Sequence, residues 1–243
     1  MKEKIGRLGK PTLVFGPGQR KRLELIKRYL SLKGKKILDI GCGIGVYANE
    51  FFKEGAKVYG IDIDKENIEL ALKSNPNLNL QIARAEALPF KDKFFDIVFL
   101  NEILEHVEDD KKTILEAYRV LKPKGKMIIF APNRLYPFET HGIYLGKKYI
   151  YHLIPFINWF PKKIRDFFCP HVRVYTKNEI KKLFKDLKIK FLILDCVLPA
   201  LDKFTFYRPK LGGILKKILN YLGKNYFFRQ FGISIFAILE KFE

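Results

Sequence analysis

Short apolar runs alternate with amphipathic stretches along this chain and predict a parallel α/β sheet. Five runs in the first part of the chain have the length of strands: 36–41, 57–62, 79–83, 95–101 and 126–131. Near-continuous apolar runs are typical of parallel strands buried on both faces, and the stretches between them supply the helical crossovers. Two later runs, Lys190 to Cys196 and Gly232 to Glu240, predict a sixth and a seventh strand.

Helix signals fall between these strands. A leading helix is expected over about 19–32, and others over about 46–54 and 109–121; the last ends before Lys122-Pro123, as a proline stop predicts. Thr176-Lys177-Asn178-Glu179 has the spacing of a capping box and opens a further helix.

Two segments exceed what the sheet needs, 134–175 and 198–231. Loops of this length in a compact domain are functional or carry their own structure. We therefore divide the chain into an N-terminal cover at 1–34, a core at 35–133, a cap insert at 134–175, and a C-terminal part of the core at 176–243 that contains the second insert.

The first strand ends in an acid and runs into a glycine loop. Asp39 closes the strand, and Gly41, Gly43 and Gly45 follow at every second position. Glycine lets the backbone turn sharply and approach a ligand closely. The dinucleotide-binding fingerprint needs its third glycine three places after the second, but here it comes one place earlier. The acid at the strand end suits a ligand with an ammonium group better than one with a pyrophosphate.

A second strand ends at Asp62, 21 residues after Gly41, and is followed by Ile63. In doubly wound folds an acid at this place accepts hydrogen bonds from ribose hydroxyls. The alternative is that Asp62 caps the next helix, a role for which Asp64 is better placed because it directly precedes the helical stretch.

Further landmarks have a familiar order. They are Ala85-Glu86-Ala87-Leu88-Pro89-Phe90, the strand 95–101, Leu104-Glu105-His106-Val107 and Arg119-Val120-Leu121-Lys122-Pro123-Lys124-Gly125. With the glycine loop and the strand ending at Asp62, they resemble the class I S-adenosylmethionine (SAM) dependent methyltransferases, in the broad group that includes quinone-biosynthesis C- and O-methyltransferases. The resemblance is specific over about 35–133.

The resemblance implies a Rossmann-like, doubly wound sheet of seven strands, the last antiparallel, with a helical and aromatic substrate cap from the inserts. It implies SAM as cofactor, adenine held near Ala85 and Glu86, and a cofactor contact from Asn101. Relatives often carry Asp where this chain has Arg84, and that carboxylate commonly binds the adenine amino group. Glu86 is the candidate substitute.

The composition of the chain argues against membrane-spanning, secreted and zinc-binding proteins. The chain contains no run of 18 uncharged apolar residues, so no transmembrane helix is expected. The N-terminal stretch lacks the apolar core of a secretory signal. Three isolated cysteines indicate a reduced, cytoplasmic protein, and four histidines without Cys or His pairing argue against a zinc site, so no metal is expected. The many lysines and few Cys and Met residues are compatible with a thermophilic source.

The net charge of +20 is unevenly distributed. Lys and Arg exceed Asp and Glu by 25 to 18 up to Asn133, and by 21 to 8 from Arg134 onward. Apolar and basic residues also alternate over 149–168 and 212–230. Three interpretations stay open: the aromatics pack on the sheet while the lysines reach solvent, the surface lies on an anionic bilayer, or it binds nucleic acid. Nucleic acid is less favoured, because no base-modifying signature is present.

The predicted activity is methyl transfer to oxygen or carbon of a hydrophobic small molecule or lipid-like acceptor, by a protein that is cytoplasmic or peripheral to a membrane. Alternatives are an RNA methyltransferase and a SAM-binding protein without turnover. For a hydroxyl acceptor, His141 is the candidate general base, ahead of His171 and the weaker Asp202. A lone histidine is often structural, however, and for Glu105 and His106 a structural or cofactor-edge role is favoured. The acceptor and the oligomeric state are not predicted.

Overall fold

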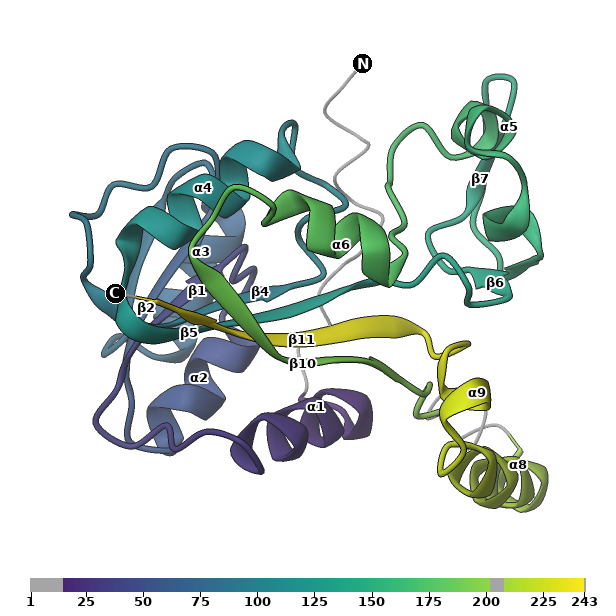
Figure 1. The fold of residues 1–243 in the computed structure, drawn as a ribbon, viewed down its shortest axis with the longest axis horizontal. Helices are drawn as coiled ribbons and strands as arrows, with labels where there is room; N and C mark the ends of the chain where they lie inside the picture. Colours follow the sequence, from purple (N-terminus) through teal and green to yellow (C-terminus); the bar gives the residue numbers. More distant parts are fainter. Residues whose placement is uncertain (1–14, 202–207, 243) are drawn as a thin grey trace.

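A computed structural model of the chain describes residues 15–201 and 208–242. Its centre is a sheet of seven strands in the order β3-β2-β1-β4-β5-β11-β10 (Figure 1). The strands are β1 Lys36–Ile40, β2 Lys57–Asp62, β3 Asn79–Ile82, β4 Phe95–Asn101, β5 Leu121–Pro132, β10 Ile189–Val197 and β11 Ser234–Lys241. Because β11 is antiparallel to both of its neighbours and the strand order reverses beside β1, the predicted doubly wound sheet is confirmed.

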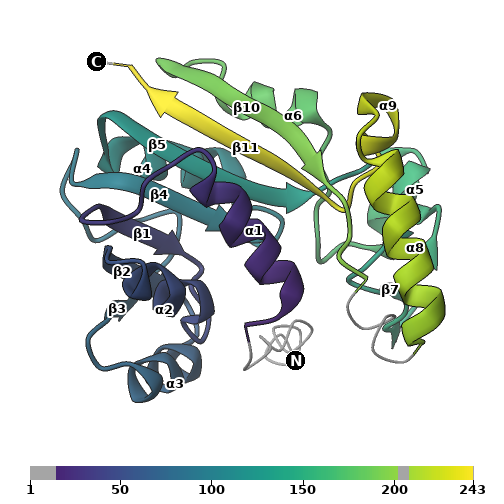
Figure 2. The ribbon, with the colours of Figure 1, turned by 90° about the horizontal axis from the view of Figure 1, so that it is seen from below.

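Helices cover both faces of the sheet (Figure 2). They are α1 Pro17–Lys27, α2 Val46–Lys53, α3 Lys65–Ser74, α4 Asp110–Val120 and α6 Lys177–Leu183. Side chains of α1 and α2, such as Ile26 and Phe51, pack in one apolar cluster. Ile114 of α4 and Ile180 of α6 pack in the cluster on the opposite face. The sheet is therefore buried on both sides, which explains its continuous apolar runs.

Local signals place most helix ends where they were expected. The Asp64 carboxylate accepts from Glu66 N–H at the start of α3, and Thr176 and Glu179 form the predicted capping box of α6. Two boundaries differ. Helix α1 ends at Lys27, where Tyr29 N–H donates to the Ile26 carbonyl in a tightened last turn. Strand β5 begins at Leu121, earlier than expected, because Leu121 already pairs with Phe95 of β4.

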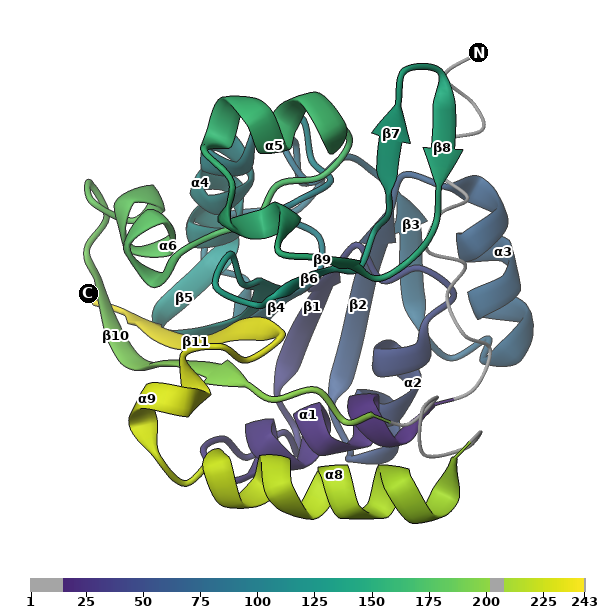
Figure 3. The same ribbon diagram turned by 90° about the vertical axis from the view of Figure 1, so that its right-hand side faces the viewer.

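The topology brings both inserts to one edge of the sheet. Strand β5 ends at its carboxyl edge, and 134–175 leaves from there. Strand β10 runs parallel to β5, since each is antiparallel to β11, so the second insert leaves the same edge. Both segments lie beyond the ends of the central strands (Figures 1 and 3). Ligands of open α/β sheets bind outside this edge.

The first insert contains four short strands as well as helix, whereas a helical and aromatic cap was expected. Its elements are β6 Phe138–Glu139, β7 Ile143–Leu145, β8 Lys148–Ile150, β9 Ile154–Pro155, the 3₁₀ turn η2 Ile157–Trp159 and α5 Lys162–Phe168. Gly146, at φ 60°, begins the two-residue turn between β7 and β8, a position that favours glycine in hairpins. The second insert is helical, with α8 Pro209–Leu222 and α9 Tyr226–Arg229.

Within the described ranges, no helix is both long enough and apolar enough to cross a membrane. The alternative base Asp202 lies outside the described residues, as does the first part of the predicted N-terminal cover.

Candidate functional site

The loop after β1 makes a close turn at the carboxyl edge. Gly41 and Gly45 have φ of 74° and 75°, in the left-handed region that favours glycine. A Cβ on Gly41 would lie 2.6 Å from Ile103 Cδ1, and one on Gly45 would lie 3.0 Å from Ala71 Cβ. Gly45 also precedes the first residue of α2, so the N–H groups of that helix face the edge. The glycines therefore satisfy both the turn and the packing around it.

Asp62 connects the glycine loop to the end of β2. Its Oδ2 accepts from Gly43 N–H at 2.8 Å, and its Oδ1 accepts from Asp64 N–H at 2.9 Å. Asp64, rather than Asp62, caps α3. The half-buried Asp62 carboxylate thus orders the loop and remains beside the cavity described next.

A cavity of about 190 Å³ opens between the ends of β1 and β2, the residues after β3, and the segment 103–108. Its lining includes five of the nine residues predicted to contact the cofactor: Gly41, Asp62, Ile63, Ala85 and Glu86. Ile63 is 65% exposed, which leaves an apolar side chain free at the rim. The structure therefore brings together side chains from four separate stretches of the chain.

The other four predicted residues lie outside that lining. Gly43 and Gly45 belong to the loop behind it, and Asp39 is 3% exposed at the end of β1. Burial, together with the negative charge of Asp62, raises the pKa of Asp39 to about 8. A cationic group placed beside this carboxyl would oppose both effects. Asp39 thus fits a ligand that carries an ammonium group.

Asn101, at the end of β4, is held by a residue that sequence reasoning did not single out. Arg22 Nη1 donates to Asn101 Oδ1 at 2.7 Å, and Arg22 Nη2 donates to Glu102 Oε1 at 2.6 Å and to Ser234 Oγ at 2.7 Å. The guanidinium also lies 4.7 Å from the Phe130 ring centroid. Arg22 therefore ties the predicted cover helix to the ends of β4 and β11.

Glu86 orders the segment that closes the cavity. Its Oε1 accepts from Glu108 N–H at 2.8 Å, and Arg84 Nε lies 3.7 Å from its Oε2. Arg84 also pairs with the Glu108 carboxylate at 2.7 Å. Both oxygens of Glu86 thus have partners within the protein, and its proposed contact with adenine stays a prediction.

Within the segment after β4, two glutamates lie close together and have pKa values shifted in opposite directions. Arg22 and Ser234 keep the pKa of Glu102 below its usual range although burial opposes them. Burial, followed by the charge of Glu102, raises the pKa of Glu105 well above its usual range. Glu102 is therefore the more acidic of the two, and Glu105, which is 2% exposed, holds its proton more tightly.

His141 lies in the first insert and is oriented by a buried acid. Glu139 Oε1 lies 3.0 Å from His141 Nδ1 and accepts from His141 N–H at 2.8 Å. Glu139 Oε2 pairs with Arg165 Nη2 at 2.8 Å, and both side chains are 1% exposed. Burial alone would raise the pKa of Glu139, but the contacts with His141 and Arg165 lower it to about 2. Because Nδ1 faces Glu139, the ring leaves Nε2 for another contact.

The insert places this pair against the segment at the cavity. The rings of His141 and His106 have centroids 5.5 Å apart, and His106 lines the cavity. One donor atom from each of Glu105, His106 and His141 lies within 4.8 Å of the other two, so the three could hold a metal ion. Spacing along the chain did not reveal this cluster, because His141 follows His106 by 35 residues.

His171 supports His141 from the other side. Its Nε2 lies 3.2 Å from the His141 carbonyl oxygen, and its ring packs against Tyr144 and Tyr149. Burial lowers the pKa of His171.

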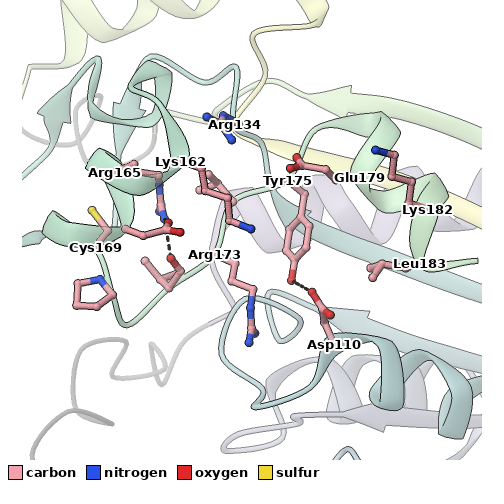
Figure 4. A pocket seen from close by; sticks show the side chains of 14 residues that line it. Asp110, Arg134, Lys162, Arg165, Cys169, Arg173, Tyr175, Glu179, Lys182 and Leu183 are labelled. Atoms are coloured by element: carbon pink, nitrogen blue, oxygen red, sulfur yellow. Dashed lines mark hydrogen bonds and ion pairs between the residues drawn. The ribbon is translucent and has the colours of Figure 1, made fainter.

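A larger cavity of about 580 Å³ lies between the first insert, α4 and α6 (Figure 4). Tyr175 Oη lies 2.9 Å from both the Leu104 carbonyl and Asp110 Oδ2, and Arg173 donates to the Val107 and Glu108 carbonyls. The residues that line this cavity therefore also hold the 103–108 segment. Lys162 of α5 and Lys182 of α6 add positive charge to its walls.

Comparisons with known proteins agree with this arrangement. The methyltransferase-domain family matches residues 38–129. A ubiquinone biosynthesis O-methyltransferase of Coxiella burnetii is 34% identical over 138 residues, covering 55% of this chain and 58% of that protein. One of Bartonella bacilliformis is 33% identical over 182 residues, covering 72% and 65%. The chain thus spans less than two thirds of the length of these relatives.

Solved structures share the fold. A SAM-dependent methyltransferase of Mesorhizobium loti has a TM-score of 0.64 at 16% identity, with 93% of this chain and 99% of that chain covered. One of Methanosarcina mazei has a TM-score of 0.59 at 20% identity, with 90% and 97% covered. Together with this fold, the methyltransferase-domain match at 38–129 implies S-adenosylmethionine as the cofactor. With the sheet order, the glycine loop and the acid after β2, the comparisons support a class I S-adenosylmethionine-dependent methyltransferase family for this chain.

Proposed function

We propose that the protein transfers a methyl group from SAM to a hydroxyl oxygen or a carbon of a hydrophobic small-molecule or lipid-like acceptor. The observation that carries the proposal is the contact between His141, oriented by Glu139, and His106 at the rim of the cofactor cavity. The names of the relatives in ubiquinone biosynthesis support an oxygen acceptor on a hydrophobic molecule.

The cofactor is assigned to the 190 Å³ cavity and its surroundings. Asp62 would accept hydrogen bonds from the ribose, and Ile63, Ala85 and Glu86 would surround the adenine. The backbone of the loop at Gly41, Gly43 and Gly45 and the buried Asp39 would face the amino-acid part, with Asn101 at the end of β4. The residues fit this ligand, because a buried carboxyl with a raised pKa suits an ammonium group.

When bound, SAM supplies a methyl group on a positively charged sulfur, which any aligned nucleophile can accept. The protein's first task is therefore to position the acceptor, an effect that can contribute about 7–11 kcal/mol. His141 Nε2 would accept the proton of an acceptor hydroxyl, while the contact of Glu139 with Nδ1 holds the ring in place. A positioned base of this kind contributes about 10²–10⁴-fold.

The first experiment identifies the acceptor class. Purified protein is incubated with methyl-labelled SAM and fractionated cell extract, and the labelled fraction is followed. Label in the organic-soluble fraction is expected. Label in RNA would favour the RNA methyltransferase alternative, and SAM binding without label in any fraction would indicate a protein that binds SAM without turnover.

The second experiment tests His141 with a catechol that carries an isoprenoid tail. His141→Ala is expected to lower kcat by about 10²–10⁴-fold, with the SAM dissociation constant within about twofold of the unchanged protein. The matched control is His152→Ala, an exposed histidine of the same insert that should leave kcat unchanged. Full activity of His141→Ala would remove the proposed base.

The same assay in EDTA examines the donor cluster of Glu105, His106 and His141. Activity that is lost in EDTA and restored by Mg²⁺ would assign the activation of the hydroxyl to a bound cation, which lowers the pKa of a bound hydroxyl group. Unchanged activity leaves His141 as the proton acceptor.

A further inference from the structure

Helix α8 presents an apolar stripe to solvent. Leu211, Ile214, Ile218 and Tyr221 are 51%, 56%, 47% and 74% exposed. Their spacing places them on one side of the helix, and α8 lies at the outer edge of the molecule in Figures 1 and 3. Because large apolar side chains gather here in the open, the packing of the second insert on the sheet does not account for them.

The sequence around this stripe is rich in positive charge, of which Arg229 pairs with Asp195 of β10. Residues 203–239 contain seven Lys and Arg residues and no Asp or Glu. On α8 itself, Lys210, Lys216 and Lys217 are exposed. Cations on the flanks of an apolar stripe are typical of helices that lie in the interface of an anionic bilayer. With 14 residues, α8 is also shorter than the roughly 20 residues needed to cross the apolar core of a bilayer.

The adjoining side of α8 faces an apolar groove of about 580 Å³. Leu215, Leu219 and Leu222 of α8 form part of it, and Phe231 and Phe138 contribute from the chain after α9 and from β6. Phe138 directly precedes Glu139, the acid that orients His141. The groove therefore borders both the exposed stripe and the insert that carries the candidate base.

We propose that the outer face of α8 docks on an anionic lipid bilayer and that the groove beside it takes the apolar tail of a lipid-borne acceptor. The assignment of the tail rests on the proposed function, whereas the docking surface does not. Three of the four residues of the stripe are aliphatic, which favours a bilayer over single-stranded nucleic acid, because nucleic acid binds to aromatic rings by base stacking. Leu211, Ile214 and Ile218 offer no such ring.

Vesicle co-sedimentation tests the docking surface. The protein should sediment with phosphatidylcholine vesicles that contain phosphatidylglycerol, and much less with phosphatidylcholine alone. Ile214→Glu combined with Ile218→Glu should weaken the association at least about tenfold. Lys216→Gln combined with Lys217→Gln should weaken it about fivefold per lysine, the effect of one cation near an anionic surface.

Matched controls carry the same changes elsewhere. Leu115 on α4 is 44% exposed, and Lys73 on α3 is also exposed, so Leu115→Glu and Lys73→Gln should bind vesicles as the unchanged protein does. SAM affinity, measured by calorimetry on every variant, shows that each one is folded.

The depth to which α8 enters the bilayer can be measured with a fluorescent residue that leaves the charge of the protein unchanged. Tyr221→Trp is placed in a Trp159→Phe background, which removes the single native tryptophan. Brominated lipids should then quench the fluorescence of residue 221.

Equal binding by the Ile214→Glu/Ile218→Glu variant, or no quenching at residue 221, would overturn the docking surface. Salt-sensitive binding of single-stranded RNA without vesicle binding would also overturn it and assign the face to nucleic acid. Methyl transfer to a soluble acceptor by a protein that does not bind vesicles would leave the proposed function standing without the docking. Vesicle binding without any methyl transfer would leave the docking surface standing without the proposed function.

Discussion

Asp39 is a buried acid whose proton should report ligand binding. Its pKa of about 8 lies above the ordinary value, so the folded protein holds this proton more tightly than the unfolded chain. The group therefore lowers stability as pH rises from about 4 toward 8. An ammonium group beside the carboxyl would stabilise its ionised form and release the proton.

We predict that SAM binding at pH 6.5 releases close to one proton per site. At that pH an α-amino group, with an ordinary pKa of about 7.7–8.0, is charged. Calorimetry in buffers with different heats of ionisation measures the release. Asp39→Asn should abolish it and weaken binding, and an unchanged release in that variant would separate Asp39 from the cofactor.

At the residue scale, local motifs predicted five of the residues that line the cavity but not the side chains that support them. Asp62 ends a recognisable strand and Ile63 follows it, and both line the cavity. Arg22 could not be predicted, because its partner Asn101 lies 79 residues away and a leading amphipathic helix offers many basic residues. Hydrogen bonds between distant elements depend on packing that no local spacing encodes.

At the scale of elements, Glu139 fastens the first insert. Its carboxylate contacts His141, two residues after the end of β6, and Arg165 of α5. Both contacts favour the ionised form of Glu139. Its pKa of about 2 lies below the ordinary 4.5. A depressed pKa contributes stability that is present above the unfolded value and is lost as pH falls through the folded one.

We predict that Glu139 contributes about 3 kcal/mol at neutral pH, lost between about pH 4.5 and 2. Glu139→Gln should lower the free energy of unfolding at pH 7 and flatten the acid limb of the stability curve. It should also speed hydrogen exchange at the amides of Thr140 and His141, which donate to Glu139. Glu69→Gln, an exposed glutamate of α3, is the control. A parallel shift of the whole curve in both variants would contradict this role.

The inserts also show where element prediction fails. Strands of the sheet are long, apolar runs, and most lie within a residue or two of their predicted bounds. The strands of the first insert are two or three residues long, too short for alternation to be visible. Gly146-Lys147, between two aromatic stretches, was the remaining signal of the β7–β8 hairpin. Aromatic content indicated burial there without distinguishing strand from helix.

At the scale of the whole molecule, topology accounts for the position of the site better than any motif. The parallel directions of β5 and β10 send both inserts to the edge where the glycine loop lies. The lopsided charge then falls on the same segments, since the excess of Lys and Arg over Asp and Glu is 13 from Arg134 onward and 7 before it. Fold and charge therefore concentrate positive charge near the candidate acceptor side.

This charge should also affect stability. A net charge of +20 destabilises the compact state through self-repulsion, and salt at 0.1 M screens exposed charges beyond about 10 Å. Raising NaCl from about 20 to 200 mM should therefore raise Tm by a few degrees, since about 1 kcal/mol corresponds to about 2–4 °C at this chain length. Lys216→Gln, Lys217→Gln and Lys224→Gln combined should reduce the response, because they remove three cations from a region without acids. A Tm that falls with salt would mean that pairs such as Arg119 with Asp92 outweigh the repulsion.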